Sequence, residues 1–407
     1  MVPKGWEQKK LEELCSLDAP ITYGVLKPGE YFCGGIPLLQ IKDLCDGSVL
    51  SNGLHLISPE LDYEYRRSRI IKNDILISLV GTIGRVAKYQ SSSEANIHRN
   101  IGRIRSNQHE YLFHYLRSDD VQRGITDSAS GSSQSALNLS TLRSMLILVP
   151  PVIEQKKIAK ILSTWDKAIS VTEKLLTNSQ QQKKALMQQL LTGKKRLLDE
   201  NGVRFSGEWK RVKLGAIADM NSGGTPKSTV EEYYGGNIPW VSISDMTSNG
   251  KWIATTEKYL TELGLNSSSA RIYPKNSVLY AMYASIGECS IAAVNLTSSQ
   301  AILGIRPKDC LNYEFLYFYL TSLKEKIKLQ GQQGTQSNLN AGMVKEFELD
   351  LPSIREQQKI AAVLSAADAE ISTLEKKLAC LRDEKKALMQ QLLTGKRRVK
   401  VDEAVAE

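Results

Sequence analysis

The ten residues ALMQQLLTGK occur at 185–194 and again, letter for letter, at 387–396. An identity of this length within one chain of 407 residues lies far beyond chance and indicates an internal duplication. Shifting the sequence by 202 positions aligns 154–196 with 356–398 without a gap and gives 26 identities in 43 positions. The chain therefore contains two copies of one structural plan.

The duplication extends beyond this segment. IPLLQIKDL (36–44) aligns with IPWVSISDM (238–246) at the same shift, and EYLFHYLRS (110–118) resembles EFLYFYLTS (314–322). Each half is a variable block followed by a near-identical helical segment. The predicted division is a first block at 1–150, a first helix at 151–197, a second block at 198–350, a second helix at 351–398 and a tail at 399–407.

The repeated segment has the heptad spacing of a coiled coil, because its seam residues alternate four and three positions apart over five heptads. Lys183 and Lys385 interrupt the stripe at equivalent places, and a polar residue in a seam usually fixes the register. The predicted seam comprises Ile158, Leu162, Trp165, Ile169, Thr172, Leu176, Ser179, Lys183, Leu186 and Leu190 in the first copy, and Ile360, Leu364, Ala367, Ile371, Leu374, Leu378, Leu381, Lys385, Leu388 and Leu392 in the second.

Two helices of about 38 residues would each be about 57 Å long. Periodicity fits a parallel pair as well as an antiparallel one. We expect the antiparallel arrangement, with a pseudo-two-fold axis relating the halves, because each block then has its own helix leading away from it.

The ends of the two segments carry helix-terminus signals. Prolines precede each helix, and Ser353 with Glu356 has the spacing of a capping box. Gly193 and Gly395 suit a left-handed residue after the last turn. Three cations follow each glycine, and capping of the helix end and contact with phosphate account for them equally well. They are Lys194, Lys195, Arg196, Lys396, Arg397 and Arg398.

Both blocks mix short apolar runs with Gly- and Ser-rich loops. Residues 70–89 and 273–294 each predict two strands around a tight turn, and 110–118 and 314–326 predict amphipathic helices. The predicted class is α+β, with two homologous mixed blocks separated by long helices. Polar loops at 23–29, 130–138, 223–229 and 331–340 are candidates for ligand contact, since their side chains can hydrogen-bond base edges and phosphates.

From these loops and from the densest positive clusters we select candidate DNA contacts, for each of which an ordinary solvated turn or a surface salt bridge is the competing interpretation. Arg69 and Arg105 belong to the same positive clusters. The candidates are Tyr23, Lys27, Arg66, Arg67, Thr82, Arg99, Arg103, Gln134, Ser135, Thr225, Lys227, Tyr283, Ser285, Gln336 and Ser337.

Composition excludes several classes of function. The net charge is +9, but residues 151–200 alone hold 10 Lys and Arg against 5 Asp and Glu, so basicity by itself is weak evidence for DNA binding. Six cysteines at irregular spacings and the lack of a long apolar run favour a reduced, cytoplasmic protein. No phosphate loop, zinc spacing or GxSxG motif occurs, and the four histidines all lie in the first block, so no duplicated catalytic or metal site is expected.

The chain resembles the specificity subunits of Type I restriction-modification systems. The resemblance rests on PPVIEQKKIAKIL and LPSIREQQKIAAVL, on the twice-written KKALMQQLLTGK, and on GGTP (223–226), IPW (238–240) and TQSNLN (335–340). The first block departs from the pattern, with ITYGVLKPG (21–29) in place of the GGTP loop and SQSALN (133–138) in place of TQSNLN.

The resemblance implies two target-recognition domains that each bind one half of a bipartite DNA site, and paired helices that set the spacer between the halves. It also implies two adenine methyltransferase subunits that bind S-adenosylmethionine, and restriction subunits that use ATP and Mg, with no cofactor or metal on this chain and no catalysis by it. A specificity subunit of a methylation-only or other defence system, or a coiled-coil adaptor that binds no DNA, remains an alternative.

Overall fold

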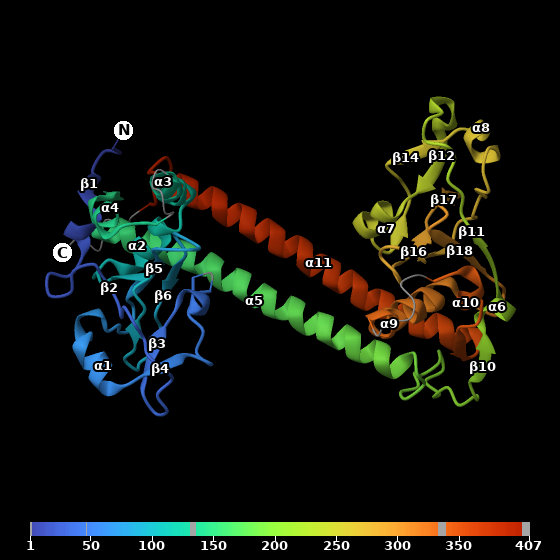
Figure 1. Ribbon diagram of the computed structural model, residues 1–407, viewed down its shortest axis with the longest axis horizontal. Helices are drawn as coiled ribbons and strands as arrows, with labels where there is room; N and C mark the ends of the chain where they lie inside the picture. The colour runs from blue at the N-terminus through green and yellow to red at the C-terminus, as the bar shows by residue number, and fades with distance from the viewer. Residues whose placement is uncertain (1, 46, 131–135, 333–338, 401–407) are drawn as a thin grey trace. The chain divides into compact units, whose positions relative to one another are not determined.

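The computed structural model describes residues 2–45, 47–130, 136–332 and 339–400. The chain forms two compact units: unit 1 is Met1–Glu173 with Lys376–Glu407, and unit 2 is Lys174–Glu375. The division falls inside both long helices, α5 (Val152–Leu190) and α11 (Ile354–Leu392) (Figure 1). Each unit therefore combines one variable block, the start of the helix that follows this block and the end of the other helix. The five segments predicted from the sequence instead kept each block and each helix apart.

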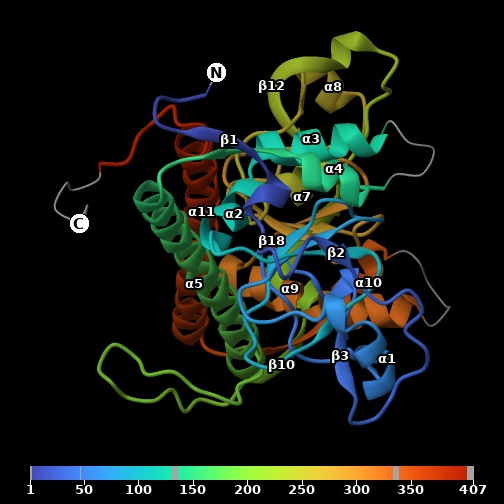
Figure 2. The same ribbon diagram turned by 90° about the vertical axis from the view of Figure 1, so that its left-hand side faces the viewer.

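Unit 1 contains a four-stranded sheet in the order β2-β8-β5-β6, a three-stranded sheet in the order β4-β3-β7, and the antiparallel pair β1-β9 (Figures 1 and 2). Its strands are β1 (Glu7–Lys10), β2 (Thr22–Tyr23), β3 (Ile36–Leu39), β4 (His55–Ile57), β5 (Ile75–Ser78), β6 (Val86–Lys88), β7 (Asn96–Ile97), β8 (Ile101–Ile104) and β9 (Leu146–Val149). Its shorter helices are α1 (Pro59–Glu64), α2 (His109–Leu116), α3 (Asp119–Ser130) and α4 (Leu139–Ser144), with single 3₁₀ turns at Leu11–Leu14, Ile41–Asp43 and Arg66–Ser68.

Unit 2 repeats this plan, with sheets β11-β18-β15-β16-β13, β14-β12-β17 and β10-β19. Its strands are β10 (Lys210–Lys213), β11 (Ala218–Ser222), β12 (Tyr234–Val241), β13 (Trp252–Ile253), β14 (Lys258–Leu260), β15 (Val278–Ala281), β16 (Cys289–Ala292), β17 (Thr297–Ser298), β18 (Ile302–Pro307) and β19 (Glu348–Leu351). Its shorter helices are α6 (Leu214–Ile217), α7 (Ile243–Asn249), α8 (Glu262–Asn266), α9 (Tyr313–Gln332) and α10 (Ala341–Lys345), with a 3₁₀ turn at Glu231–Tyr233.

Strand directions match between the units. β3 is antiparallel to β4 and parallel to β7, as β12 is to β14 and β17. The two predicted strand pairs are confirmed, because β5 pairs with β6 around the loop at 79–85 and β15 pairs with β16 around 282–288. The predicted helices at 110–118 and 314–326 correspond to α2 and α9. The second block thus repeats the fold of the first.

The two long helices bury the predicted stripe. All twenty seam positions are buried or half-buried, while most residues between them are exposed. In unit 1, Arg382 of α11 pairs with Glu173 of α5, and Lys385 pairs with Asp166, so residue numbers fall along one helix as they rise along the other. Unit 2 shows the same direction, because Lys183 pairs with Asp368 and Ser179 donates to Glu370 at 3.0 Å. The helical segments are antiparallel in each unit.

The repeated ALMQQLLTGK ends inside the cores of the blocks. Leu190 and Leu191 are buried with the core of unit 2, and Leu392 and Leu393 are buried with the core of unit 1. Gly193 and Gly395 have φ of +68°, as predicted for left-handed positions. The segment at the end of α5 therefore packs on the second block, and the segment at the end of α11 packs on the first block.

An Arg–Glu–Trp cluster fixes each of these junctions. In unit 2, Glu356 is 1% exposed and accepts hydrogen bonds from Arg196 at 2.5 and 2.7 Å and from Trp209 at 3.2 Å. Arg398, Trp6 and the buried Glu154 form the same cluster in unit 1. Arg196 and Arg398 are therefore committed to a protein carboxylate.

The predicted capping box forms only in part. The Glu356 backbone N–H lies 3.4 Å from Ser353 Oγ, but the Glu356 carboxylate turns to Arg196 and Trp209 instead of the backbone N–H of Ser353. A charge-assisted bidentate pair with arginine is stronger than a neutral capping bond, which explains the difference.

Candidate nucleic-acid interface

Several polar segments of unit 1 meet where β5 ends. The backbone N–H of Leu79 donates to the carbonyl of Asn100 at 2.8 Å, and the N–H of Leu137 donates to the carbonyl of Leu79 at 2.8 Å. The loop at 79–85, the residues before β8 and the residues from 136 onward therefore lie side by side. We call this surface, which also includes 25–29, the loop edge of unit 1.

The chain after β2 reaches the loop edge through a close backbone approach. Val25 N–H donates to the Ile97 carbonyl at 2.7 Å, and Arg99 N–H donates to the Val25 carbonyl at 2.9 Å. A Cβ on Gly24 would lie 1.6 Å from the Ile97 oxygen, so only glycine fits. Lys27 and Arg99 are thereby brought to the same edge.

The side chains at this edge suit contact with nucleic acid. Lys27, Thr82 and Arg99 are exposed, and neither Lys27 nor Arg99 forms an ion pair with a described carboxylate. Ammonium and guanidinium groups bind phosphate oxygens, and arginine can also donate to guanine in the major groove. The structure therefore gathers three of the predicted residues on one surface.

Arg66 and Arg67 extend the positive surface from the turn after α1. The guanidinium of Arg67 lies 6.0 Å from the ring centre of Tyr23, and that of Arg66 lies 4.8 Å from the ring centre of Tyr63. Both arginines are exposed, whereas Tyr23 is half-buried. Tyr23 thus supports Arg67 and presents only part of its surface.

The prediction that Arg103 contacts DNA is wrong. Arg103 is 3% exposed, and its guanidinium donates to the carbonyls of Pro20 at 2.9 Å and Arg69 at 3.2 Å. Burial lowers the pKa of Arg103, the direction expected when a charged group loses water. Arg69 and Arg105 are likewise occupied, by Asp62 and Asp74. Three of the six clustered arginines are therefore bonded to groups of the protein itself.

Unit 2 fills the place of Arg103 differently. Gly304 pairs with Leu279 in the same way that Arg103 pairs with Leu76, so the two positions are equivalent. The ring of Tyr273 packs directly on Gly304, because a Cβ on this glycine would lie 2.2 Å from a ring atom. Tyr273 donates to the Asn221 carbonyl at 2.9 Å. A tyrosine over a glycine thus replaces the buried arginine, which supports a structural role for that position.

The loop edge of unit 2 is built in the same way from 223–227, 282–288, 299–301 and the residues from 339 onward. Met282 N–H donates to the Ala301 carbonyl at 2.9 Å, and Leu339 N–H donates to the Met282 carbonyl at 3.1 Å. A Cβ on Gly224 would lie 2.1 Å from the Ala270 nitrogen, and Trp240 Nε1 donates to the Gly224 carbonyl at 2.9 Å. The GGTP loop is therefore anchored by Trp240, for which unit 1 has Leu38.

The predicted residues of the second block lie on this edge. Thr225, Lys227 and Tyr283 are exposed, and Ser285 is half-buried. Ala284 has a φ of +57°, where the matching loop of unit 1 has Gly81 at +77°. An alanine in the left-handed region is strained, which is common at binding loops.

Gln300 is a candidate that the sequence alone did not indicate. It is exposed, and its backbone N–H lies 3.4 Å from Thr225 Oγ1. Ile97 and Ser298 pair with equivalent strands, which makes Gln300 the counterpart of Arg99. Aligning the halves at a shift of 201 here would have found it. The predicted Gln134, Ser135, Gln336 and Ser337 lie outside the described residues.

The described residues offer no arrangement for metal chemistry, since no group of three or more His, Cys, Asp or Glu side chains is placed to hold a metal ion. Among the helices of the same described part, none is both long and apolar enough to span a membrane.

Comparisons with known proteins agree with the duplicated architecture. The model of the Type I restriction modification DNA specificity domain matches residues 3–178 and again 206–381. A Methanocaldococcus jannaschii protein that bears the name of a type I restriction enzyme MjaX specificity subunit is 26% identical over 419 residues, covering 98% of this chain and 95% of its own length. The Escherichia coli EcoBI specificity subunit is 31% identical over 196 residues, covering 47% of this chain and 41% of its own.

Solved structures show the same fold. A Type I restriction-modification S subunit from M. genitalium has a TM-score of 0.61 at 15% identity, with 96% of each chain covered. A chain from a structure of the type I R-M system has a TM-score of 0.59 at 20% identity, covering 98% of this chain and 100% of its own. The family model matches most of the sequence in two copies, one in each half, and the chain therefore belongs to the Type I restriction-modification DNA specificity family.

Proposed function

We propose that this chain gives a Type I restriction-modification complex its DNA sequence specificity, with each loop edge binding one half of a bipartite site. The observation that carries the proposal is that one backbone scaffold presents different side chains at equivalent places. Arg99 corresponds to Gln300, and Thr82 corresponds to Ser285. Arginine favours guanine, whereas glutamine pairs well with adenine, so two such edges suit two different half-sites.

We further propose that two copies of one methyltransferase subunit bind the repeated helix ends. Both copies expose an identical surface on one helical face, spaced four residues apart, which we call the repeated face. It comprises Lys184, Ala185, Gln188 and Gln189 on α5 and Lys386, Ala387, Gln390 and Gln391 on α11. The exposed residues 180–182 and 382–384 on the same helices differ at every position. Packing does not constrain an exposed residue, so the identity of these exposed residues supports a shared external contact.

α5 and α11 are proposed to set the spacer between the half-sites. Their continuous helical structure and buried antiparallel seam within each unit support this role. The chain itself is proposed to supply no catalytic group, with S-adenosylmethionine on the methyltransferase subunits and ATP and Mg on restriction and translocase subunits. The cell compartment proposed is the cytoplasm.

The proposed sequence specificity is tested by exchanging residues 15–145 for the matching segment of a relative. Methylated adenines are then mapped genome-wide in a host that carries the methyltransferase. This segment leaves Trp6, β1 and β9 in place, because Trp6 donates to Glu154 of α5 and β1 pairs with β9. One half of the methylated sequence should change and the other should persist. Exchange of 218–346 is the matched control and should change only the opposite half; a change in both halves from either exchange would refute the two-edge model.

The test of the spacer is insertion of seven residues into both helices, after Glu173 and after Glu375, where the units divide. Matched insertions preserve an antiparallel seam and add about 10 Å of helix, equivalent to about three base pairs. A spacer of unchanged length, with both half-sites intact, would rule out a measuring role for the helices.

A further inference from the structure

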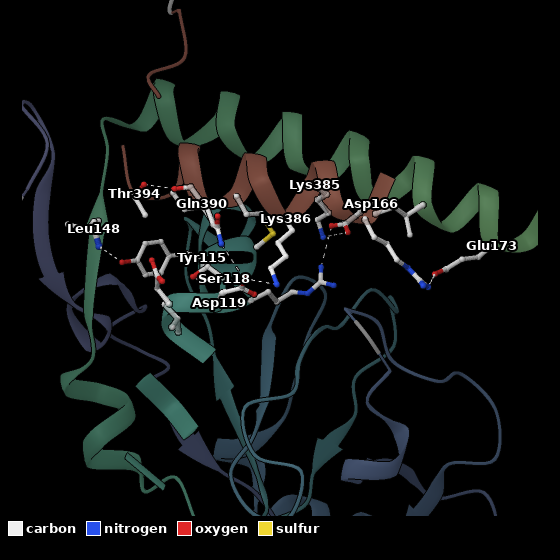
Figure 3. Close-up of a pocket in the computed structure, with 17 residues that line it drawn as sticks. Tyr115, Ser118, Asp119, Leu148, Asp166, Glu173, Lys385, Lys386, Gln390 and Thr394 are labelled. Atoms are coloured by element: carbon white, nitrogen blue, oxygen red, sulfur yellow. Dashed lines mark hydrogen bonds and ion pairs between the residues drawn. The ribbon is translucent and has the colours of Figure 1, made fainter. Parts of the chain in front are cut away.

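The repeated face is presented differently in the two units. In unit 1 the helix that begins with α2 breaks at Arg117 and Ser118, and α3 starts afresh at Asp119. The Asp119 carboxylate lies 3.2 Å from Lys386 Nζ and 3.5 Å from Gln390 Nε2 (Figure 3). Two polar residues of the repeated face on α11 are therefore already engaged by a residue of the block.

The break also places the start of α3 beside the end of α11. A cavity of about 300 Å³ lies between them, bordered by Ser118, Asp119, Lys386, Gln390 and Thr394 (Figure 3). A second hollow shares Asp119, Lys386 and Gln390 and continues along α3 to Arg123 and Asp127. A partner that contacts these residues of α11 has to contact or displace the start of α3.

No described residue of unit 2 makes the equivalent contact. There α9 runs without a break from Tyr313 to Gln332, and the position that matches Asp119 is Leu323, a half-buried residue that packs on the core. Lys184 and Gln188 are exposed, and neither side chain forms an ion pair or hydrogen bond with a described residue. The same polar groups that are engaged in unit 1 are available in unit 2.

We propose that the two methyltransferase-binding faces are unequal, and that Asp119 makes the face of unit 1 the weaker one. This inference rests on the proposed function of the repeated face. Assembly is then ordered: the first methyltransferase copy binds the end of α5 in unit 2, and the second binds the end of α11 in unit 1 after Lys386 and Gln390 leave Asp119.

The size of the effect follows from the exposure of the pair. The side chains of Lys386 and Asp119 are 62% and 41% exposed, so water screens their attraction. Exposed pairs of this kind are weak, which corresponds to about a two- to five-fold difference between the intrinsic dissociation constants of the two faces. The difference should also shrink as salt rises, because the pair is exposed.

The experiment is titration of the full chain with its methyltransferase subunit, followed by native mass spectrometry and by calorimetry to obtain both intrinsic constants. Lys386→Glu should remove the weaker step and Lys184→Glu the tighter one, which assigns each step to a unit. Asp119→Ala should tighten the weaker step two- to five-fold and leave the other unchanged. Asp120→Ala is the matched control, since Asp120 pairs with Arg123 of its own helix and should change neither step.

Three results would overturn the inference: equal intrinsic constants in the unmodified chain, loss of the tighter step in Lys386→Glu, or no change in the ratio on Asp119→Ala. Thermal unfolding of each variant distinguishes lost binding from a lost fold. If the unmodified chain bound no methyltransferase at all, the proposed function of the repeated face would fail instead, and the two failures are therefore distinguishable.

Discussion

Lys385 Nζ lies 2.5 Å from Asp166 Oδ1 in unit 1, and the residues at the same places in the duplicated sequence, Lys183 and Asp368, pair in unit 2. Each lysine stands in the seam of one long helix, and each aspartate belongs to the other. The lysines that interrupt the apolar stripe therefore have a charged partner across the seam. A charged pair that is satisfied in only one alignment of two helices favours that alignment over neighbouring ones.

Removing Asp166 should destabilise unit 1 more than removing Lys385. Asp166 also pairs with Arg117 at 3.3 Å, so Asp166→Ala removes one carboxylate from two cations at once and leaves the poorly solvated Lys385 without its seam partner, whereas Lys385→Ala leaves Asp166 paired with Arg117. We expect a loss of about 3 kcal/mol for Asp166→Ala and of about half that for Lys385→Ala. Hydrogen exchange of α2 amides measures the loss. The exposed Asp383→Ala serves as control and should change stability by less than about 0.5 kcal/mol; an equal loss in the two seam variants would contradict the argument.

Arg196 should be needed for the stability of unit 2, although it follows a helix end and looks like a surface cation. Arg196→Met leaves the buried Glu356 carboxylate without its bidentate partner, which costs about 3 kcal/mol for a buried charge. Denaturant unfolding followed by the fluorescence of Trp209 is the measurement. Lys195→Met, one residue earlier and exposed, should leave the midpoint unchanged; similar midpoints for both variants would show that the cluster contributes little.

Arg99 and Arg103 should separate DNA binding from folding. Arg99→Ala removes an exposed cation from the loop edge of unit 1, so DNA affinity should fall, and the slope of log affinity against log salt should decrease by about 0.9 if the contact is to phosphate. Thermal stability should stay the same. Arg103→Ala should instead lower thermal stability, because it leaves the Pro20 carbonyl without its donor. Filter binding across a salt series and thermal melts check both; a salt slope unchanged by Arg99→Ala would remove it from the phosphate contacts.

Features that depend on neighbouring residues could be predicted from the sequence, whereas the burial and partners of side chains that depend on distant residues could not. Heptad spacing identified the seam, and the two tight turns identified the strand pairs, because both are periodic features of neighbouring residues. Arg103 was misassigned because its burial depends on β2 and on the turn after α1, which lie far away in the sequence. Arg196 was ambiguous for the same reason, since its partner Glu356 lies 160 positions away. Gln300 was missed because the alignment shift between the halves is 203 at β15 but 201 at β18, and neither equals the 202 of the long helices.

His114 should make unit 1 sensitive to acid. Its side chain is 1% exposed and bonds to Ser163 Oγ at 3.0 Å, and burial lowers its pKa to about 3. Asp166 opposes this shift, whereas Lys385, Arg117 and Lys88 add to it. Because an unfolded histidine titrates near 6.5, the neutral folded form contributes its full stabilisation above about pH 6.5 and loses it as the pH falls toward 3.

The test is His114→Phe, since Phe318 holds the same place in unit 2 and is fully buried there. The variant should remove a slope of about 1.4 kcal/mol per pH unit from the stability of unit 1 below pH 6.5. Hydrogen exchange of α2 amides between pH 4 and 7, corrected for the intrinsic pH dependence of exchange, measures that slope, and amides of α9 provide the internal control. The same slope in both proteins would mean that carboxylates, and not His114, govern the acid response of unit 1.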